Sequence, residues 1–230
     1  MPERTGGPSD LEHALHEQFA RVAKALASPA RVALVDVLCQ GERSVEALSL
    51  AAGLGMKNTS AQLRELRLVG LVEARREGTR VYYRVAEEAV CVFLGQLRHL
   101  ARRRLAEVDR LVRDHLELSG DLEPVRRVQL LERVARGEVV VFDVRPREEY
   151  KAGHIPGARS VPLEELDSCL AGPLGDVEIV AYCRGPYCVL APQAVSACRA
   201  RGLRARRLED GFPEWRLAGL PVALGAEEAA

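Results

Sequence analysis

One short segment, CRGPYC at residues 183–188, combines two cysteines with an arginine and a glycine. It directly follows an apolar run at residues 178–182, which is typical of a buried parallel strand, and it precedes a helix predicted from residue 189. Open α/β sheets bind their ligands at the carboxyl ends of such strands. The sequence therefore predicts a reactive loop in which Cys183 is the nucleophile. The predicted loop comprises Cys183, Arg184, Gly185, Pro186, Tyr187 and Cys188.

The surroundings of Cys183 predict an ionised thiol. Backbone amides of a glycine-containing loop point inward, and the following helix adds a partial positive charge at its N-terminus. Such a site lowers the pKa of a thiol and gives the nucleophilic thiolate. Arg184 is expected to add positive charge for an anionic sulfur donor. Cys188 has two interpretations: it attacks a Cys183 persulfide and closes a disulfide, or it fills space under the loop.

A second group of residues has the chemistry of nucleic-acid recognition. Residues 43–84 carry eight Lys or Arg and four acidic residues, a local net charge of +4 in a chain whose formal net charge is zero. A helix predicted at 57–69 presents polar side chains that can contact base edges or phosphates, and the tip of a following hairpin is basic. The predicted DNA-binding residues are Lys57, Asn58, Ser60, Gln62, Arg64, Arg76 and Arg80.

The elements that position these residues follow from apolar spacing and turn signals in the first half of the chain. Ser28-Pro29 and Ser44 are good helix starts, and Glu77-Gly78 is a hairpin turn. A short helix, a glycine turn, a second helix and a two-stranded ribbon predict a winged helix-turn-helix. The expected helices span 10–27, 29–40, 44–53, 57–69 and 87–117, and the strands 71–74 and 81–85.

Beyond residue 124 the pattern changes to strands alternating with helices, which predicts an α/β domain with a parallel sheet. The fold class is therefore α+β multidomain, with a mainly helical N-terminal part and an α/β C-terminal part. We expect domains at 1–118 and 125–230, joined by a linker at 119–124. The expected strands are 139–144, 178–182 and 203–208, and the helices 129–136, 146–152, 163–170, 189–201 and 213–218.

The run from Leu26 to Val85 resembles the ArsR/SmtB family of transcriptional repressors. Its segments are ALASPARVALVDVL, GERSVEALSLAAGL and NTSAQLRELRLVGLVEARREGTRVYYRV. The resemblance implies a homodimer formed through the helices at 10–27 and 87–117. It also implies an operator in double-stranded DNA with twofold symmetry.

The sensing sites of that family do not transfer to this sequence. The third helix contains no cysteine, and His99, Asp109, Asp114 and His115 lack the spacing of the family's metal site in the last helix, so we predict no metal. Some relatives sense sulfur through one cysteine in the second helix and one in the last. Cys39 and Cys91 lie on those helices, but each is displaced from the usual place. Buried reduced thiols are the default expectation for Cys39, Cys169 and Cys198, and a Cys39–Cys91 switch stays open.

Residues 124–224 resemble a single rhodanese domain. The motifs are DVRPREEYKAGHIPGA at 143–158, CRGPYC at 183–188 and DGFPEWRLAGLPV at 210–222. The resemblance implies that Cys183 takes a sulfane sulfur from a donor such as thiosulfate or polysulfide and passes it on from a persulfide. A related cysteine phosphatase needs an arginine at position 189, where this chain has Val189. The residues expected to support the pocket are Asp143, Arg145, Glu148 and His154.

Composition places these domains in a cytoplasmic protein without a membrane span, and no cofactor is implied. The two halves together predict a repressor that senses reactive sulfur through Cys183. Two alternatives stay open. One is a sulfurtransferase that uses the winged half for dimerisation, and the other is a metalloid-responsive repressor.

Overall fold

The computed structural model describes residues 8–116, 123–172 and 177–225. The chain divides after Leu94 into two compact units, Met1–Leu94 and Gly95–Ala230. We call them the winged unit and the C-terminal unit. Most of the linker predicted at 119–124 lies outside the described residues, so the predicted domain limits remain a prediction.

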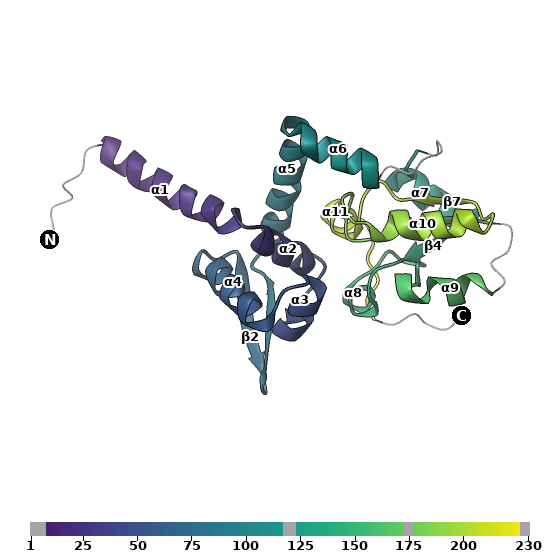
Figure 1. Ribbon diagram of the computed structural model, residues 1–230, viewed down its shortest axis with the longest axis horizontal. Coiled ribbons are helices and arrows are strands. Elements are labelled where there is room, and N and C mark those ends of the chain that lie inside the picture. The colour runs from purple at the N-terminus through teal and green to yellow at the C-terminus, as the bar shows by residue number, and fades with distance from the viewer. Residues whose placement is uncertain (1–7, 117–122, 173–176, 226–230) are drawn as a thin grey trace. The chain divides into compact units, whose positions relative to one another are not determined.

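Apart from one short additional strand, the winged unit follows the predicted element order (Figure 1). Ser44 accepts a hydrogen bond from the amide of Ala47 and so caps its helix, while Pro29 occupies the first turn of another. Gly78 turns the hairpin with a φ of 58°. The elements are α1 Pro8–Leu26, α2 Pro29–Leu38, β1 Arg43–Ser44, α3 Val45–Ala51, α4 Met56–Leu68, β2 Val72–Glu77 and β3 Arg80–Val85.

The sheet of the winged unit is antiparallel, with the order β1-β3-β2. The hairpin register pairs Val72 with Val85 at one end and Glu77 with Arg80 at the tip. Strand β1 was not predicted, because two residues are too few to show an alternating pattern. The apolar residues that return every three or four positions form the core, and Leu34, Leu48, Leu63 and Leu66 are completely buried.

The prediction of one long helix at 87–117 is wrong. The structure has α5 at Glu88–Arg104 and α6 at Ala106–His115, with Leu105 in an extended conformation between them. Charge explains the break: the last turn of α5 is basic and the first turn of α6 is acidic, which matches the dipoles of two separate helices. Arg102 and Asp109 also form an ion pair across the break.

The rest of the C-terminal unit is built on a parallel four-stranded sheet with the order β5-β4-β6-β7. Its strands are β4 Val139–Asp143, β5 Arg159–Ser160, β6 Glu178–Tyr182 and β7 Ala205–Arg207. Its helices are α7 Arg127–Ala135, α8 Arg147–Ala152, the 3-10 turn η1 Leu163–Glu165, α9 Leu166–Leu170, α10 Leu190–Ala200 and α11 Phe212–Leu217. The short strand β5 was not predicted.

Two apolar clusters cover the two faces of this sheet. One packs Leu130 of α7 and Trp215 of α11 against β4 and β6. The other packs Leu166 of α9 and Val195 of α10 against the opposite face, and Cys183 belongs to this second cluster. The alternation of strands and helices therefore gives the layered arrangement that the sequence predicts. Within the described ranges, no helix is long and apolar enough to cross a membrane.

Candidate functional site

The loop at 183–188 joins the carboxyl end of β6 to the start of α10. Cys183 is only 3% exposed, whereas Cys188 is half-buried. Backbone amides point toward both sulfurs: those of Gly185 and Ala191 toward Cys183, and those of Arg184 and Leu190 toward Cys188. The loop therefore has the inward amides that the sequence predicts, but it directs them at two thiols.

The two cysteines of the loop lie together. Cys188 packs against the apolar cluster that contains Cys183, and each thiol shifts the pKa of the other through a side-chain hydrogen bond. The Cys183 sulfur also lies 3.8 Å from the carbonyl oxygens of Gly185 and Cys188, within reach of a weak S–H donor. The proton on Cys183 consequently has several acceptors in the resting loop.

The pKa values of the two loop thiols shift in opposite directions. Burial raises the pKa of Cys183 well above its usual value, because desolvation outweighs the amides that face it. The hydrogen bond from Cys183 lowers the pKa of Cys188 to about 7, and the amides of Leu190 and Arg184 lower it further. The lower pKa of the pair is therefore that of Cys188, whereas the sequence predicts the thiolate at Cys183.

Arg184 has a carboxylate partner that the sequence did not predict, and its charge still lowers the pKa of Cys188. Its guanidinium binds both carboxylate oxygens of Glu149, with Nη2 2.7 Å and Nε 3.0 Å from Oε1. Glu149 is completely buried, so the pair is a structural link between α8 and the loop. The positive charge that we expected to attract an anionic donor is balanced by this carboxylate.

Glu149 is a residue that the sequence reasoning missed. We expected Glu148 to support the pocket, but Glu148 is exposed and the next residue is buried. The two glutamates are adjacent in a helix of six residues. In so short a helix, apolar spacing is too sparse to show which one faces the loop.

The backbone at Gly211 lies directly beneath the loop. A Cβ atom at this position would lie 2.2 Å from the backbone nitrogen of Gly185, so only glycine fits. The amide of Phe212 donates to the carbonyl of Cys183 at 3.1 Å, and the Glu214 carboxylate accepts from the amide of Gly211. Burial raises the pKa of Glu214. The closing helix α11 therefore holds the loop in place through backbone contacts.

The predicted supporting residues form a buried network beside the loop. Arg145 binds Asp143 and donates to the carbonyl of Gly153 at 2.7 Å, and Tyr182 donates to Asp143 at 2.6 Å. His154 is buried, stacks on the ring of Tyr150 and contacts its carbonyl oxygen. This network holds the segment after β4.

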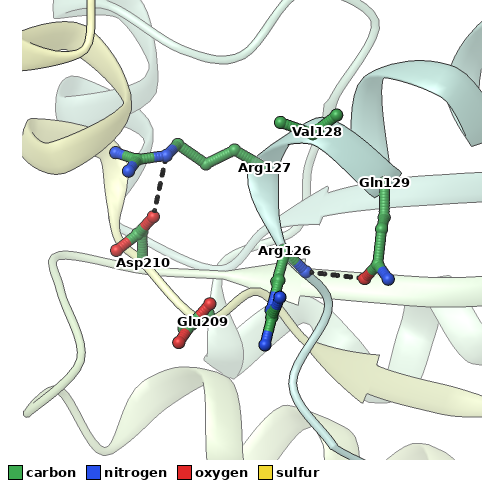
Figure 2. A pocket seen from close by; sticks show the side chains of 6 residues that line it. All are labelled: Arg126, Arg127, Val128, Gln129, Glu209 and Asp210. Atoms are coloured by element: carbon green, nitrogen blue, oxygen red, sulfur yellow. Dashed lines mark hydrogen bonds and ion pairs between the residues drawn. The ribbon is translucent and has the colours of Figure 1, made fainter.

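Two surface hollows of the C-terminal unit include residues of the loop or of the segment before α11. Tyr187 and Val189 line an apolar hollow of about 400 Å³ together with α6 residues such as Leu111. A second hollow, of about 440 Å³, lies at the start of α7 (Figure 2). There Arg127 forms an ion pair with Asp210 at 3.3 Å, which ties α7 to the segment before α11.

The predicted DNA-binding residues lie on α4 and on the hairpin. All of them are exposed except Gln62, which is half-buried. Gln62 accepts a hydrogen bond from Arg31 and donates one to Asn58, so its amide is held within the winged unit. At the hairpin, Arg75 is tied to Glu42 and Glu77. Arg76 and Arg80 are exposed near the tip, where Arg76 donates to the carbonyl of Gly78.

The winged unit contains a disulfide between Cys39 and Cys91. The default expectation of reduced, unpaired thiols is therefore wrong for this pair, while Cys198 is a buried free thiol. Cys39 follows the last residue of α2 and Cys91 lies in the first turn of α5, with their Cα atoms 5.7 Å apart. Among the residues described, no group of three or more His, Cys, Asp or Glu could hold a metal ion.

Comparisons with known proteins cover both units. A family model described as a rhodanese-like domain matches residues 127–218. The "HTH-type transcriptional regulator Rv0324" of Mycobacterium tuberculosis is 51% identical over 220 residues, which cover 96% of this chain and 96% of its own.

Two further matches are partial. The human "Thiosulfate:glutathione sulfurtransferase" is 54% identical over 37 residues, 16% of this chain and 32% of that protein. A solved homodimeric winged helix-turn-helix DNA-binding domain, Mb0332 from Mycobacterium bovis, is 48% identical. It covers 44% of this chain and 94% of its own, with a TM-score of 0.40.

Proposed function

The chain belongs to the family of HTH-type transcriptional regulators that Rv0324 represents, and we propose that it is a homodimeric repressor that senses reactive sulfur through Cys183. One observation carries the proposal: a single polypeptide holds both a helix-turn-helix with an exposed polar helix and a rhodanese-like domain with a cysteine pair in its loop. The winged unit supplies the DNA contacts, and the C-terminal unit supplies the sulfur chemistry.

The winged unit is suited to an operator in double-stranded DNA. Helix α4 presents Lys57, Asn58 and Arg64 to solvent, and a helix of this kind fits the major groove. Arg76 and Arg80 at the hairpin tip are suited to phosphates or the minor groove. Gln62 supports this surface by holding Asn58.

Helix α1 supplies the argument for a homodimer. Leu11 and Phe19 are 60% and 64% exposed, and Leu15 and Val22 lie on the same apolar stripe. Large exposed apolar patches mark protein–protein contacts in soluble proteins. A second copy of the chain, as the sequence resemblance implies, would cover this stripe.

In the sulfur reaction, Cys183 takes one sulfur atom from thiosulfate or polysulfide. The proton on Cys183 moves to Cys188, and the Cys183 thiolate attacks the outer sulfur of thiosulfate. A Cys183 persulfide forms and sulfite leaves with the electron pair of the broken S–S bond. Backbone amides of Gly185 and Ala191 stabilise the negative charge during this step.

The Cys39–Cys91 disulfide supports a second route of sensing. It links α2 to α5 within the unit that carries α4, so its reduction releases a constraint between helices of the DNA-binding fold. This route responds to the thiol redox state and does not need the rhodanese-like domain. The alternative of a sulfurtransferase without DNA binding predicts turnover and no operator.

Two measurements test the proposal. The first is selection of DNA fragments by the full-length protein, followed by a shift assay with Arg80→Ala; we expect a specific operator whose binding weakens in the variant. The second is peptide mass spectrometry after thiosulfate, in which the peptide with Cys183 gains one sulfur atom and Cys183→Ser does not. If Cys183 gains sulfur but no specific operator is selected, the result would support the alternative of a sulfurtransferase without DNA binding.

A further inference from the structure

The reactive loop contains a second thiol whose surroundings resemble those of a nucleophile. Cys188 accepts a hydrogen bond from the Cys183 thiol and faces the amides of Arg184 and Leu190. Cys188 packs against the cluster that contains Cys183, and it is half-buried, so it remains accessible from solvent. A cysteine that only filled space would not need three polar partners around its sulfur.

Cys198 provides the comparison within the same unit. It is buried in the apolar cluster on the α10 face of the sheet, and burial raises its pKa to about 11. Cys188 packs against the same cluster but is only half-buried, and its pKa is lowered to about 7. A thiol with a pKa near ambient pH is the best attacking group in thiol–disulfide exchange.

We propose that Cys188 is the resolving thiol of the loop: it discharges the sulfur on Cys183 as hydrogen sulfide and leaves a Cys183–Cys188 disulfide. This inference rests on the proposed persulfide of Cys183. It adds an activity to that function, the conversion of sulfane sulfur to sulfide at the expense of a dithiol.

The step balances without a further reactant. The proton that Cys188 took from Cys183 passes to the outer sulfur of the persulfide. The Cys188 thiolate then attacks the sulfur that is bonded to the Cβ atom of Cys183, and a bond forms between the two cysteine sulfurs. The bond to the outer sulfur breaks, and that sulfur leaves with the electron pair and its proton as HS⁻. The two cysteine sulfurs lose two electrons, and the outer sulfane sulfur gains them. A dithiol reductant then restores both thiols.

The disulfide gives the sulfur signal a defined covalent form. Cys183 follows β6, and Cys188 precedes α10, so the bond closes the loop between these two elements. A persulfide leaves the loop open, whereas the disulfide ties its two ends together. The loop therefore has three chemical states: dithiol, persulfide and disulfide.

The experiment treats fully reduced full-length protein with one equivalent of thiosulfate and measures released sulfide together with the masses of the loop peptides. In the wild type, we expect sulfide release and a loop peptide that has lost two hydrogens. In Cys188→Ser, we expect sulfide release to fall by about tenfold or more and the persulfide to remain on Cys183. Cys169→Ser, which changes a free cysteine outside the loop, should behave like the wild type.

Each other outcome has a distinct meaning. Equal sulfide release in the wild type and Cys188→Ser, with the persulfide persisting in both, would overturn the resolving role and leave the proposed function intact. No sulfur on Cys183 in any protein would overturn the proposed function itself. Formation of the persulfide in Cys188→Ser also shows that the loop of this variant is folded. Cys188→Ala provides a second variant without the Cys188 thiol.

Discussion

The chemical character of the two loop cysteines depends on their surroundings more than on their order in the chain. Burial raises the pKa of Cys183, and the hydrogen bond from Cys183 lowers the pKa of Cys188. One proton is therefore shared by a pair, and the reactivity of either thiol depends on the other. The same reasoning applies to Arg184, whose charge is matched by Glu149.

The first prediction concerns the pKa of Cys188. Alkylation of Cys188 by iodoacetamide should become faster as pH rises through about 7, because the thiolate is the nucleophile. Cys183→Ala removes the hydrogen-bond donor, so the pKa of Cys188 should rise and its alkylation at pH 7 should slow. Peptide mass spectrometry over a pH series measures both effects. An unchanged pH profile in Cys183→Ala would contradict the shared proton.

The second prediction concerns the buried ion pair. Glu149→Gln should lower the free energy of unfolding of the C-terminal unit by about 3 kcal/mol, because Arg184 then lacks a charged partner in a largely buried place. Glu148→Gln is the matched control, and this exposed neighbour should change stability by less than about 0.5 kcal/mol. Chemical denaturation measures both variants. Equal losses in the two proteins would argue against the pair.

The sequence predicted the reactive loop but not the partners that control it. Cys183 and Cys188 were found because an apolar strand and a glycine loop flank them. Glu149 was missed because its exposed neighbour has the same chemistry and the helix is short. The shared proton was missed because it depends on how deeply one sulfur is buried, and a sequence pattern does not show depth.

At the scale of elements, the spacing of apolar residues predicted most helices and strands. The main error was the single helix predicted at 87–117, and the charges near Leu105 explain it. The break at Leu105 lies between a basic last turn and an acidic first turn, a pattern we had not used. The disulfide between α2 and α5 was equally hard to predict, since it depends on how two helices pack. Strands β1 and β5 have only two residues each, and they exist because a neighbouring strand pairs with them.

The third prediction concerns this disulfide. Reduction, or Cys91→Ser, should destabilise the winged unit by about 4 kcal/mol, because the crosslink closes a loop with a sequence separation of 52. Thermal denaturation with and without a dithiol measures the loss. Cys91→Ser should show no further response to the reductant, whereas Cys169→Ser should keep the wild-type response. A wild-type protein that is indifferent to reductant would contradict a stabilising crosslink.

The fourth prediction concerns the hairpin. Arg80→Ala should weaken DNA binding about equally for all sequences, because a phosphate contact carries no base information. The slope of log K against log salt concentration should become smaller by about 1, because one phosphate contact is lost. Arg84→Ala is the control, since Arg84 is paired with Glu73 at 2.7 Å. Fluorescence anisotropy at several salt concentrations measures both. If Arg84→Ala changed the salt dependence as much as Arg80→Ala, the hairpin tip would not be the contact.

At the scale of the whole molecule, the chain joins two units with separate chemistry. The winged unit has the surface for DNA and the exposed apolar stripe of α1. The C-terminal unit has the cysteine pair at the carboxyl edge of its sheet. Sulfur sensing requires that the chemical state of the C-terminal unit change the DNA affinity of the winged unit, which is a coupling free energy between two sites.

The most direct test measures operator affinity and the state of Cys183 in the same samples of full-length protein, before and after a sulfane sulfur donor. We expect the operator affinity to change by about fivefold or more as sulfur reaches the loop. Cys183→Ser should bind the operator with the affinity of the untreated wild type and should not respond. An identical response in Cys183→Ser, or an unchanged affinity when Cys183 is fully converted, would contradict sulfur sensing through this loop.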